Sequence, residues 1–356
     1  MRILFMGTPD FAVASLKALV EAGHEVCGVF TQPDRPKNRG HKLAQSPVKE
    51  YAVTQGLEVF QPLKMRDGEA LDIVERLQPE LIVVAAYGKI LPEEILNAPK
   101  YGSINVHSSV LPKYRGAAPI NWAILNGESV TGVTIMDMAR ELDAGDIIRC
   151  VETKIDPEED ALTLTTRLAA LGAEALLRAI EDIEAGTAVH TPQEHEKHTY
   201  APMLDKSLSP MDFTKDAQVL HDQVRGLIPW PCATMTLNGG TVKVYRTAVG
   251  EKTDAAPGSI AEAGKQGIAV ACGDGRLLWI LELQPEGGKH MESRAYQLGD
   301  SEWRKCDRRD NHGYGEGTGC GRYHSLRGDG NRPRRGRADA DDPLGGVGRG
   351  GASAGN

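Results

Sequence analysis

The first 107 residues alternate short apolar runs with amphipathic segments, and this alternation constrains the fold more than any other feature of the chain. The apolar runs cover residues 2–6, 25–30, 57–60, 80–86 and 103–107. The amphipathic segments have helical spacing and cover residues 11–22, 46–55 and 67–77. Uninterrupted apolar runs are typical of strands buried on both faces. Because these strands alternate with helices, we predict an α/β fold built on a doubly wound, mostly parallel sheet.

The chain is longer than one hydrophobic core usually requires, so its 356 residues predict two domains. Two further strand-like runs at 130–138 and 146–154 and a long amphipathic helix at 161–185 complete the first domain. We place this domain at residues 1–186. Residues 187–210 are polar and have no sustained periodicity, which indicates a linker that needs no ordered structure of its own.

A second domain is predicted at residues 211–299. A helical pattern at 217–228 is followed by short β-like segments with Gly-rich turns between them. These segments cover residues 233–237, 241–248, 267–271 and 277–283. Their length and spacing predict a small antiparallel β-barrel.

The composition changes abruptly in residues 300–356, where Gly and Arg dominate and large apolar residues nearly vanish. Such a tail cannot bury enough apolar surface to offset its chain entropy, so we predict disorder. An Arg/Gly-rich tail could bind RNA. The same composition also arises when a GC-rich gene is read out of frame, and this frameshift interpretation is the one that we favour.

The charge of the chain excludes a uniformly basic nucleic-acid binder, because its net value is −8 at pH 7. A local basic patch is still present in the Pro- and Gly-containing loop that follows the run at 25–30. Four cations in this loop could hold phosphates, and a plain solvated loop is the alternative. They are Arg35, Lys37, Arg39 and Lys42.

Cysteine usage and the N-terminus bear on the cellular compartment. The six Cys residues have no metal-like or disulfide-framework spacing, which favours free thiols and a reducing compartment. The apolar run at the N-terminus is too short for a signal peptide, and no run approaches the length of a membrane span. We therefore expect a cytoplasmic protein with no membrane contact.

Three polar residues stand at or beyond strand ends and form the candidate catalytic group. Asn105 and His107 lie at the end of one predicted strand, and Asp143 lies in the loop between the next two. An amide that donates a hydrogen bond, an imidazole and a carboxylate suit acyl transfer to an amine, which needs oxyanion stabilisation and proton removal. The sequence contains no Ser or Cys nucleophile motif and no metal-ligand spacing nearby, so we expect no metal.

Each of these residues also has an ordinary interpretation. A lone Asn can satisfy a loop carbonyl, a lone His is more often a satisfied interior residue, and Asp143 lies in a turn-like sequence. The role of His107 also stays open at this level, because an imidazole can donate to an oxyanion or relay the proton of the amine.

Several motifs taken together resemble the methionyl-tRNA formyltransferases, a family of folate-dependent formyltransferases. The most specific are Gly7-Thr8-Pro9-Asp10-Phe11, Gln32-Pro33-Asp34-Arg35-Pro36, Asn105-Val106-His107, Leu111-Pro112-Lys113-Tyr114-Arg115-Gly116-Ala117-Ala118-Pro119-Ile120, Thr131-Gly132-Val133-Thr134-Ile135-Met136 and Leu142-Asp143-Ala144-Gly145-Asp146. The resemblance extends from residue 1 to about residue 299. It implies a Rossmann-like formyltransferase domain followed by an OB-like domain that binds tRNA.

The resemblance also implies the reaction and the residues that carry it. The formyl group of 10-formyltetrahydrofolate would pass to the α-amine of initiator methionyl-tRNA, giving N-formylmethionyl-tRNA for translation initiation. Asn105, His107 and Asp143 would be catalytic, and the basic loop with Arg35, Lys37, Arg39 and Lys42 would contact the tRNA. Folate contacts would come from Ser109, Val110, Leu111 and Pro112. We expect the enzyme to act as a monomer.

Two other functions remain compatible with the sequence. The first is a formyltransferase that acts on a small amine, such as glycinamide ribonucleotide or an amino sugar. The second is a tRNA-binding protein without catalysis. The basic loop and the second domain favour the tRNA substrate, because a small acceptor needs neither.

Overall fold

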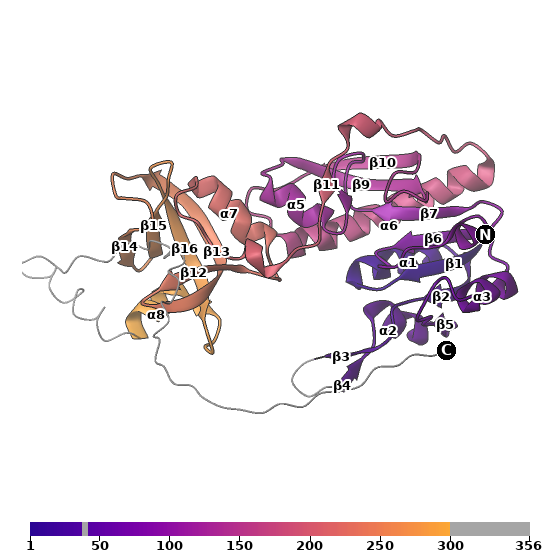
Figure 1. Ribbon diagram of the computed structural model, residues 1–356, viewed down its shortest axis with the longest axis horizontal. Coiled ribbons are helices and arrows are strands. Elements are labelled where there is room, and N and C mark those ends of the chain that lie inside the picture. Colours follow the sequence, from indigo (N-terminus) through magenta and orange to yellow (C-terminus); the bar gives the residue numbers. More distant parts are fainter. Residues whose placement is uncertain (38–41, 300–356) are drawn as a thin grey trace, which may run out of the picture.

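A seven-stranded sheet forms the middle of the first domain (Figure 1). The computed structural model describes residues 1–37 and 42–299. The strand order is β10-β9-β7-β6-β1-β2-β5, in which β1, β2, β5, β6 and β7 are parallel and β9 and β10 are antiparallel. The strands are β1 (Arg2–Gly7), β2 (Glu25–Phe30), β5 (Val59–Phe60), β6 (Leu81–Ala85), β7 (Ser103–His107), β9 (Val130–Asp137) and β10 (Ile147–Lys154). The predicted mostly parallel sheet is confirmed.

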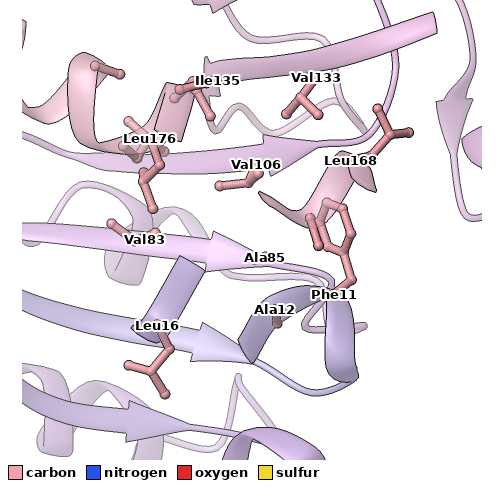
Figure 2. Packing of buried hydrophobic residues seen from close by; sticks show 14 of the residues in the cluster. Phe11, Ala12, Leu16, Val83, Ala85, Val106, Val133, Ile135, Leu168 and Leu176 are labelled. Carbon is pink, nitrogen blue, oxygen red and sulfur yellow. The ribbon is translucent and has the colours of Figure 1, made fainter. Parts of the chain in front are cut away.

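Helices cover both faces of this sheet, as a doubly wound fold requires. They are α1 (Asp10–Glu21), α2 (Pro47–Thr54), α3 (Glu69–Leu77), α4 (Glu93–Leu96), α5 (Pro119–Leu125) and α6 (Ala161–Ala185). On one face, side chains of α1 and α6 meet those of β6, β7 and β9, as Figure 2 shows. On the other face, α3 and α4 pack on a separate apolar cluster.

Strand β1 shows why the strands of this sheet have uninterrupted apolar sequences. Ile3 and Phe5 belong to the core under α1 and α6, whereas Leu4 and Met6 belong to the core under α3 and α4. Successive side chains of a strand point to opposite faces, so a strand covered on both faces needs apolar residues at every position. All four of these side chains are fully buried.

The second domain is an antiparallel sheet with one helix in its core. The strand path is β12-β13-β16-β15-β14, and β17 pairs with β16. Apolar residues of α7 pack against the strands, and the helix precedes them in the chain as predicted. The elements are α7 (Ala217–Gly226), β12 (Ala233–Leu237), β13 (Gly240–Lys252), β14 (Ile260–Gly264), β15 (Gly267–Ala271), β16 (Arg276–Pro285), β17 (Met291–Glu292) and α8 (Ser293–Gly299).

The segment 187–210 differs from our expectation, because it is ordered and lies against the first domain. It contains β11 (Tyr200–Ala201), which pairs in parallel with β8 (Arg115–Gly116), and the short helices η1 (His195–Lys197) and η2 (Lys206–Leu208). Thr191 and Ile147 also exchange backbone hydrogen bonds. These contacts join residues far apart in the sequence, so no local periodicity could reveal them.

The basic loop forms a short hairpin of β3 (Arg35–Lys37) and β4 (Lys42–Ala44), which the sequence did not predict. Within the described ranges, no helix is long and apolar enough to cross a membrane. Cys27, Cys150, Cys232 and Cys272 are free thiols. The predictions of disorder and of a frameshift for residues 300–356 lie outside the described residues.

Candidate active site

A cavity of about 620 Å³ opens at the carboxyl ends of β6 and β7. Its wall contains Asn105, His107 and Asp143, so the structure brings the three predicted catalytic residues to one place. The segment after β6, from Ala86 to Leu91, forms another part of the wall. From β1 the chain builds the sheet toward β2 and β5 on one side, and then returns to add β6 and β7 on the other side. Ligands of open α/β sheets bind where the strand order reverses in this way.

Strand β7 holds the first two residues of the site on the same side. Asn105 and His107 are two positions apart, and alternate residues of a strand share a face. Both positions are paired on each side of β7, because Asn105 lies opposite Val84 of β6 and Met136 of β9, and His107 lies opposite Thr134. The half-buried side-chain amide of Asn105 makes no hydrogen bond to any residue that the structure describes. It is therefore available to a ligand in the cavity.

The imidazole of His107 has one nitrogen engaged and one directed at Asp143. Its Nε2 donates a hydrogen bond to the carbonyl oxygen of Tyr114 at 2.9 Å. A carbonyl can only accept, so this contact fixes a proton on Nε2. Nδ1 lies 3.8 Å from Oδ2 of Asp143. The proton that can be gained or lost is therefore the one on Nδ1.

The carbonyl that fixes His107 belongs to a residue that is itself held firmly. Tyr114 has a left-handed backbone (φ 62°), and its N–H donates to Oγ1 of Thr199 at 2.8 Å. Its hydroxyl donates to Glu128 at 2.8 Å, and burial raises the pKa of Tyr114 to about 12. The phenol therefore stays neutral, and Tyr114 is an anchor for the imidazole.

Asp143 lies in a loop and has an unusual backbone conformation. Its φ is 49°, in the left-handed region that a non-Gly residue seldom adopts. The backbone N–H of Gly116 donates to Oδ2 of Asp143 at 2.8 Å. Two residues later, a Cβ on Gly145 would lie only 1.9 Å from the carbonyl oxygen of Asp137, so only glycine fits there. The loop thus follows a narrow path that aims the carboxylate at His107.

Sequence reasoning assigned no role to two buried polar residues beside this loop, Arg115 and Gln193. Arg115 lies in one of the family-like motifs, but nothing in its local sequence indicated a partner. Gln193 lies in the segment that we interpreted as a linker, and no sequence signal marked it. The two side chains hydrogen-bond to one another and to the loop of Asp143.

The predicted folate contacts Ser109, Val110, Leu111 and Pro112 are near the site but are not among the residues that line the cavity. Ser109 is fully buried, and its hydroxyl donates to the carbonyl oxygen of Lys113 at 2.7 Å. The backbone N–H of Leu111 donates to Thr134. In this structure the segment stabilises the turn after β7, and its folate contact remains a prediction.

The predicted tRNA contacts lie on the β3–β4 hairpin, except for Arg39, which is outside the described residues. Lys37 and Lys42 are directly paired positions of the two strands, and Arg35 is exposed. Burial and the positive charge of Arg35 lower the pKa of Lys89, a residue of the cavity wall. The hairpin therefore places at least one cation close enough to the cavity to act on its charges.

The three histidines of segment 187–210 are exposed. His190 Nδ1 lies 2.5 Å from Oδ2 of Asp137, and His198 contacts the carbonyl oxygen of His195. Among residues 1–37 and 42–299, no group of three or more His, Cys, Asp or Glu side chains is arranged to hold a metal ion.

Solved structures of low sequence identity share the fold. HypX from Aquifex aeolicus in complex with tetrahydrofolic acid is 20% identical with a TM-score of 0.57, and the match covers 86% of this chain and 48% of that one. WlaRD, a sugar 3N-formyl transferase, is 19% identical with a TM-score of 0.60, over 78% of this chain and 96% of that one. At this identity the likeness shows the fold alone.

Family models and curated relatives agree on a closer assignment. The formyl transferase model matches residues 1–180, and the model of the formyl transferase C-terminal domain matches residues 203–300. A methionyl-tRNA formyltransferase of Acetivibrio thermocellus is 48% identical over 301 residues, covering 84% of this chain and 96% of the relative. One of Geobacter sulfurreducens is 47% identical over 299 residues, covering 84% and 94%. The resemblance of the motifs is confirmed, and the chain belongs to the methionyl-tRNA formyltransferase family.

Proposed function

We propose that this enzyme transfers the formyl group of 10-formyltetrahydrofolate to the α-amine of initiator methionyl-tRNA and so supplies N-formylmethionyl-tRNA for translation initiation. The curated relatives support this substrate pair, because they match nearly their whole length at almost half identity. The observation that carries the chemistry is the unengaged amide of Asn105 beside His107 and Asp143 in one cavity. The cavity volume is within the range of about 300–1,000 Å³ that is usual for small-molecule sites.

Asn105 stabilises the charge that develops during transfer. When the neutral amine attacks the formyl carbon, electrons of the C=O bond move to oxygen. The amide of Asn105 donates a hydrogen bond to that oxygen and needs no reorganisation, because none of the described residues hydrogen-bonds to it beforehand. As the new C–N bond forms, the bond from the formyl carbon to N10 of the folate breaks.

His107 and Asp143 move the proton that the attacking amine loses. The attacking amine must lose one proton, and N10 of the folate gains one when it leaves. With Nε2 held by Tyr114, Nδ1 of His107 is the atom that takes the proton and returns it. Asp143 stabilises the imidazole while it carries the positive charge, because its carboxylate faces Nδ1.

The two large substrates approach from different parts of the molecule. We assign the folate to the cavity and, as an untested role, to Ser109–Pro112 beside it. The cations of the β3–β4 hairpin contact the acceptor end of the tRNA, since Arg35 is exposed beside the cavity wall. We further propose that the enzyme acts as a monomer. We place the enzyme in the cytoplasm, where bacterial translation takes place.

The test is a formyl-transfer assay with three acceptors. The protein is mixed with 10-formyltetrahydrofolate and methionyl-initiator tRNA, glycinamide ribonucleotide or an amino-sugar nucleotide, and the formylated product is measured by mass spectrometry. We expect N-formylmethionine with the tRNA and at most trace product with the small amines. A small amine as the better acceptor would replace the tRNA in this proposal. Salt-dependent tRNA binding without release of tetrahydrofolate would reject catalysis altogether.

A further inference from the structure

We propose that Gln193 and Arg115 are positioning residues that hold Asp143 at its working distance from His107, so that segment 187–201 is part of the active site. This inference rests on the proposed chemistry of Asp143 and extends it to residues outside the catalytic trio. Gln193 lies 50 positions from Asp143 in the sequence, yet it is buried against the loop that carries Asp143.

Gln193 uses its whole hydrogen-bonding capacity in this arrangement. Its Nε2 donates to the carbonyl oxygens of Asp143 at 2.9 Å and of Gly145 at 2.7 Å. Its Oε1 accepts from Nε of Arg115 at 3.1 Å and from Nη2 at 2.7 Å. An amide has two N–H donors and one oxygen with two lone pairs, so all four positions are filled. Because Gln193 is only 5% exposed, water cannot replace a lost partner easily.

Arg115 determines which way the amide faces. A guanidinium only donates, so it must meet the oxygen of Gln193 and leave the NH₂ group directed at the loop. Arg115 is 3% exposed, and its remaining Nη1 lies 3.3 Å from the carboxylate of Glu141. A buried charge needs such partners, and here they also lock the guanidinium in place. The pair therefore acts as one rigid support with a fixed orientation.

The pair of Gln193 and Arg115 contacts the part of the loop whose backbone conformation is least favourable. A left-handed backbone at a residue other than Gly costs on the order of 1–3 kcal/mol and persists only where surrounding contacts enforce it. Gln193 holds the carbonyl of Asp143 itself, and the N–H of Gly116 holds its carboxylate. Gly116 in turn lies in β8, which pairs with Tyr200–Ala201. Segment 187–201 thus fixes Asp143 through both its backbone and its side chain.

Small displacements of Asp143 would change its interaction with His107, because the two side chains lie just beyond hydrogen-bond distance. The 3.8 Å between Oδ2 of Asp143 and Nδ1 of His107 is longer than a hydrogen bond, which forms near 2.7–3.2 Å. A shift of a few tenths of an ångström toward His107 would strengthen the contact, and a shift away would remove it. Gln193 is placed to control this distance, although it is not among the residues that line the cavity.

The test compares Gln193→Ala with Gln223→Ala. Gln223 is a matched control, because its Nε2 also donates to two backbone carbonyls, of Leu208 at 2.7 Å and of Pro210 at 3.1 Å, outside the cavity wall. We expect Gln193→Ala to lower kcat by about 10- to 100-fold, as for a small misplacement of a catalytic group, with KM for both substrates little changed. Gln193→Glu, which keeps the acceptor for Arg115 but loses the two donors, should lower kcat similarly.

A second measurement separates positioning from general destabilisation and does not depend on activity. The ¹⁵N resonances of the His107 ring should shift in Gln193→Ala and stay in place in Gln223→Ala, while thermal denaturation shows how far each variant is destabilised. Unchanged kcat and unchanged His107 resonances in Gln193→Ala would overturn the inference. Equal losses of kcat and stability in both variants, with unchanged resonances, would also overturn it, because they describe a structural role only. If the resonances shift while the wild type forms no formylmethionine, the positioning role holds and the proposed function fails.

Discussion

The two halves of the candidate active site are held in different ways. Asn105 and His107 lie on β7, whose backbone is paired on both sides and whose core face is packed under α6. Asp143 lies in an irregular loop with a left-handed backbone, and its position depends on Gly116, Gly145 and Gln193. A strand fixes its side chains through the backbone hydrogen bonds and core packing that form the sheet itself, whereas a loop needs contacts from distant segments. The strand half should therefore fail only when a catalytic atom is removed, and the loop half should fail when a support is removed.

The largest effect is expected on the strand half from Asn105→Ala. Loss of one oxyanion donor typically lowers kcat by about 10²- to 10³-fold. The backbone of β7 stays paired, so the melting temperature and the KM for each substrate should change little. Steady-state kinetics with both substrates and a thermal melt check this together. A variant that keeps turnover near the wild-type value would remove Asn105 from the mechanism.

An intermediate effect is expected on the loop half from Gly145→Ala. The added Cβ would collide with the carbonyl oxygen of Asp137, so the loop must move, and overpacking of this kind costs about 1–3 kcal/mol. Both kcat and the melting temperature should fall, in contrast to Asn105→Ala.

Gly240→Ala in the second domain is the control for this change. A Cβ there would meet its nearest neighbour, the carbonyl oxygen of Leu237, at an ordinary 3.7 Å. This variant should match the wild type in both measurements. Full activity of Gly145→Ala would show that the loop tolerates displacement and that the contrast between the two halves is wrong.

The smallest effect is expected at the base of the β3–β4 hairpin, outside both halves. Hydrogen bonds from Lys49 and Gln61 lower the pKa of Asp34 below its ordinary value of 3.8. A carboxylate whose pKa is lower in the folded than in the unfolded state stabilises the fold fully when the pH is above its unfolded-state pKa. This contribution is lost as the pH falls through the folded-state pKa. Asp34→Asn should therefore lower the free energy of unfolding at pH 7 by less than about 1 kcal/mol, as for a partly exposed pair.

Urea denaturation at pH 7 and at pH 3 measures this effect. The difference between Asp34→Asn and the wild type should shrink at pH 3, and kcat should be unchanged at pH 7. A difference that grows in acid would contradict the pairing of Asp34 with Lys49.

The same contrast explains which parts of the molecule the sequence predicted. The strands at 25–30 and 103–107 and the helix at 161–185 have the predicted bounds, because each is recorded in local apolar spacing. The sequence also placed Asn105 and His107 at a strand end and Asp143 in a loop beyond the next strand, and the structure brings the three to one cavity. Their catalytic roles remain a prediction.

The parts that were missed depend on contacts between distant residues. The pairing of β8 with β11 joins positions more than 80 residues apart, and the paired strands β3 and β4 have no apolar alternation. Gln193 gives no signal, because a polar residue in a polar segment looks the same whether it faces solvent or a buried loop. Burial of such a residue is a property of the folded chain alone.

The order of segment 187–201 has a consequence for dividing this protein into pieces. A truncated fragment that stops where α6 ends, at Ala185, would contain the whole catalytic trio and every strand of the large sheet. It would nevertheless lack Gln193, Thr199 and the edge strand that pairs with Gly116. The proposed support of Asp143 therefore predicts that an active fragment must reach at least to Ala201, and that a boundary drawn at the last helix leaves the loop of Asp143 without these contacts.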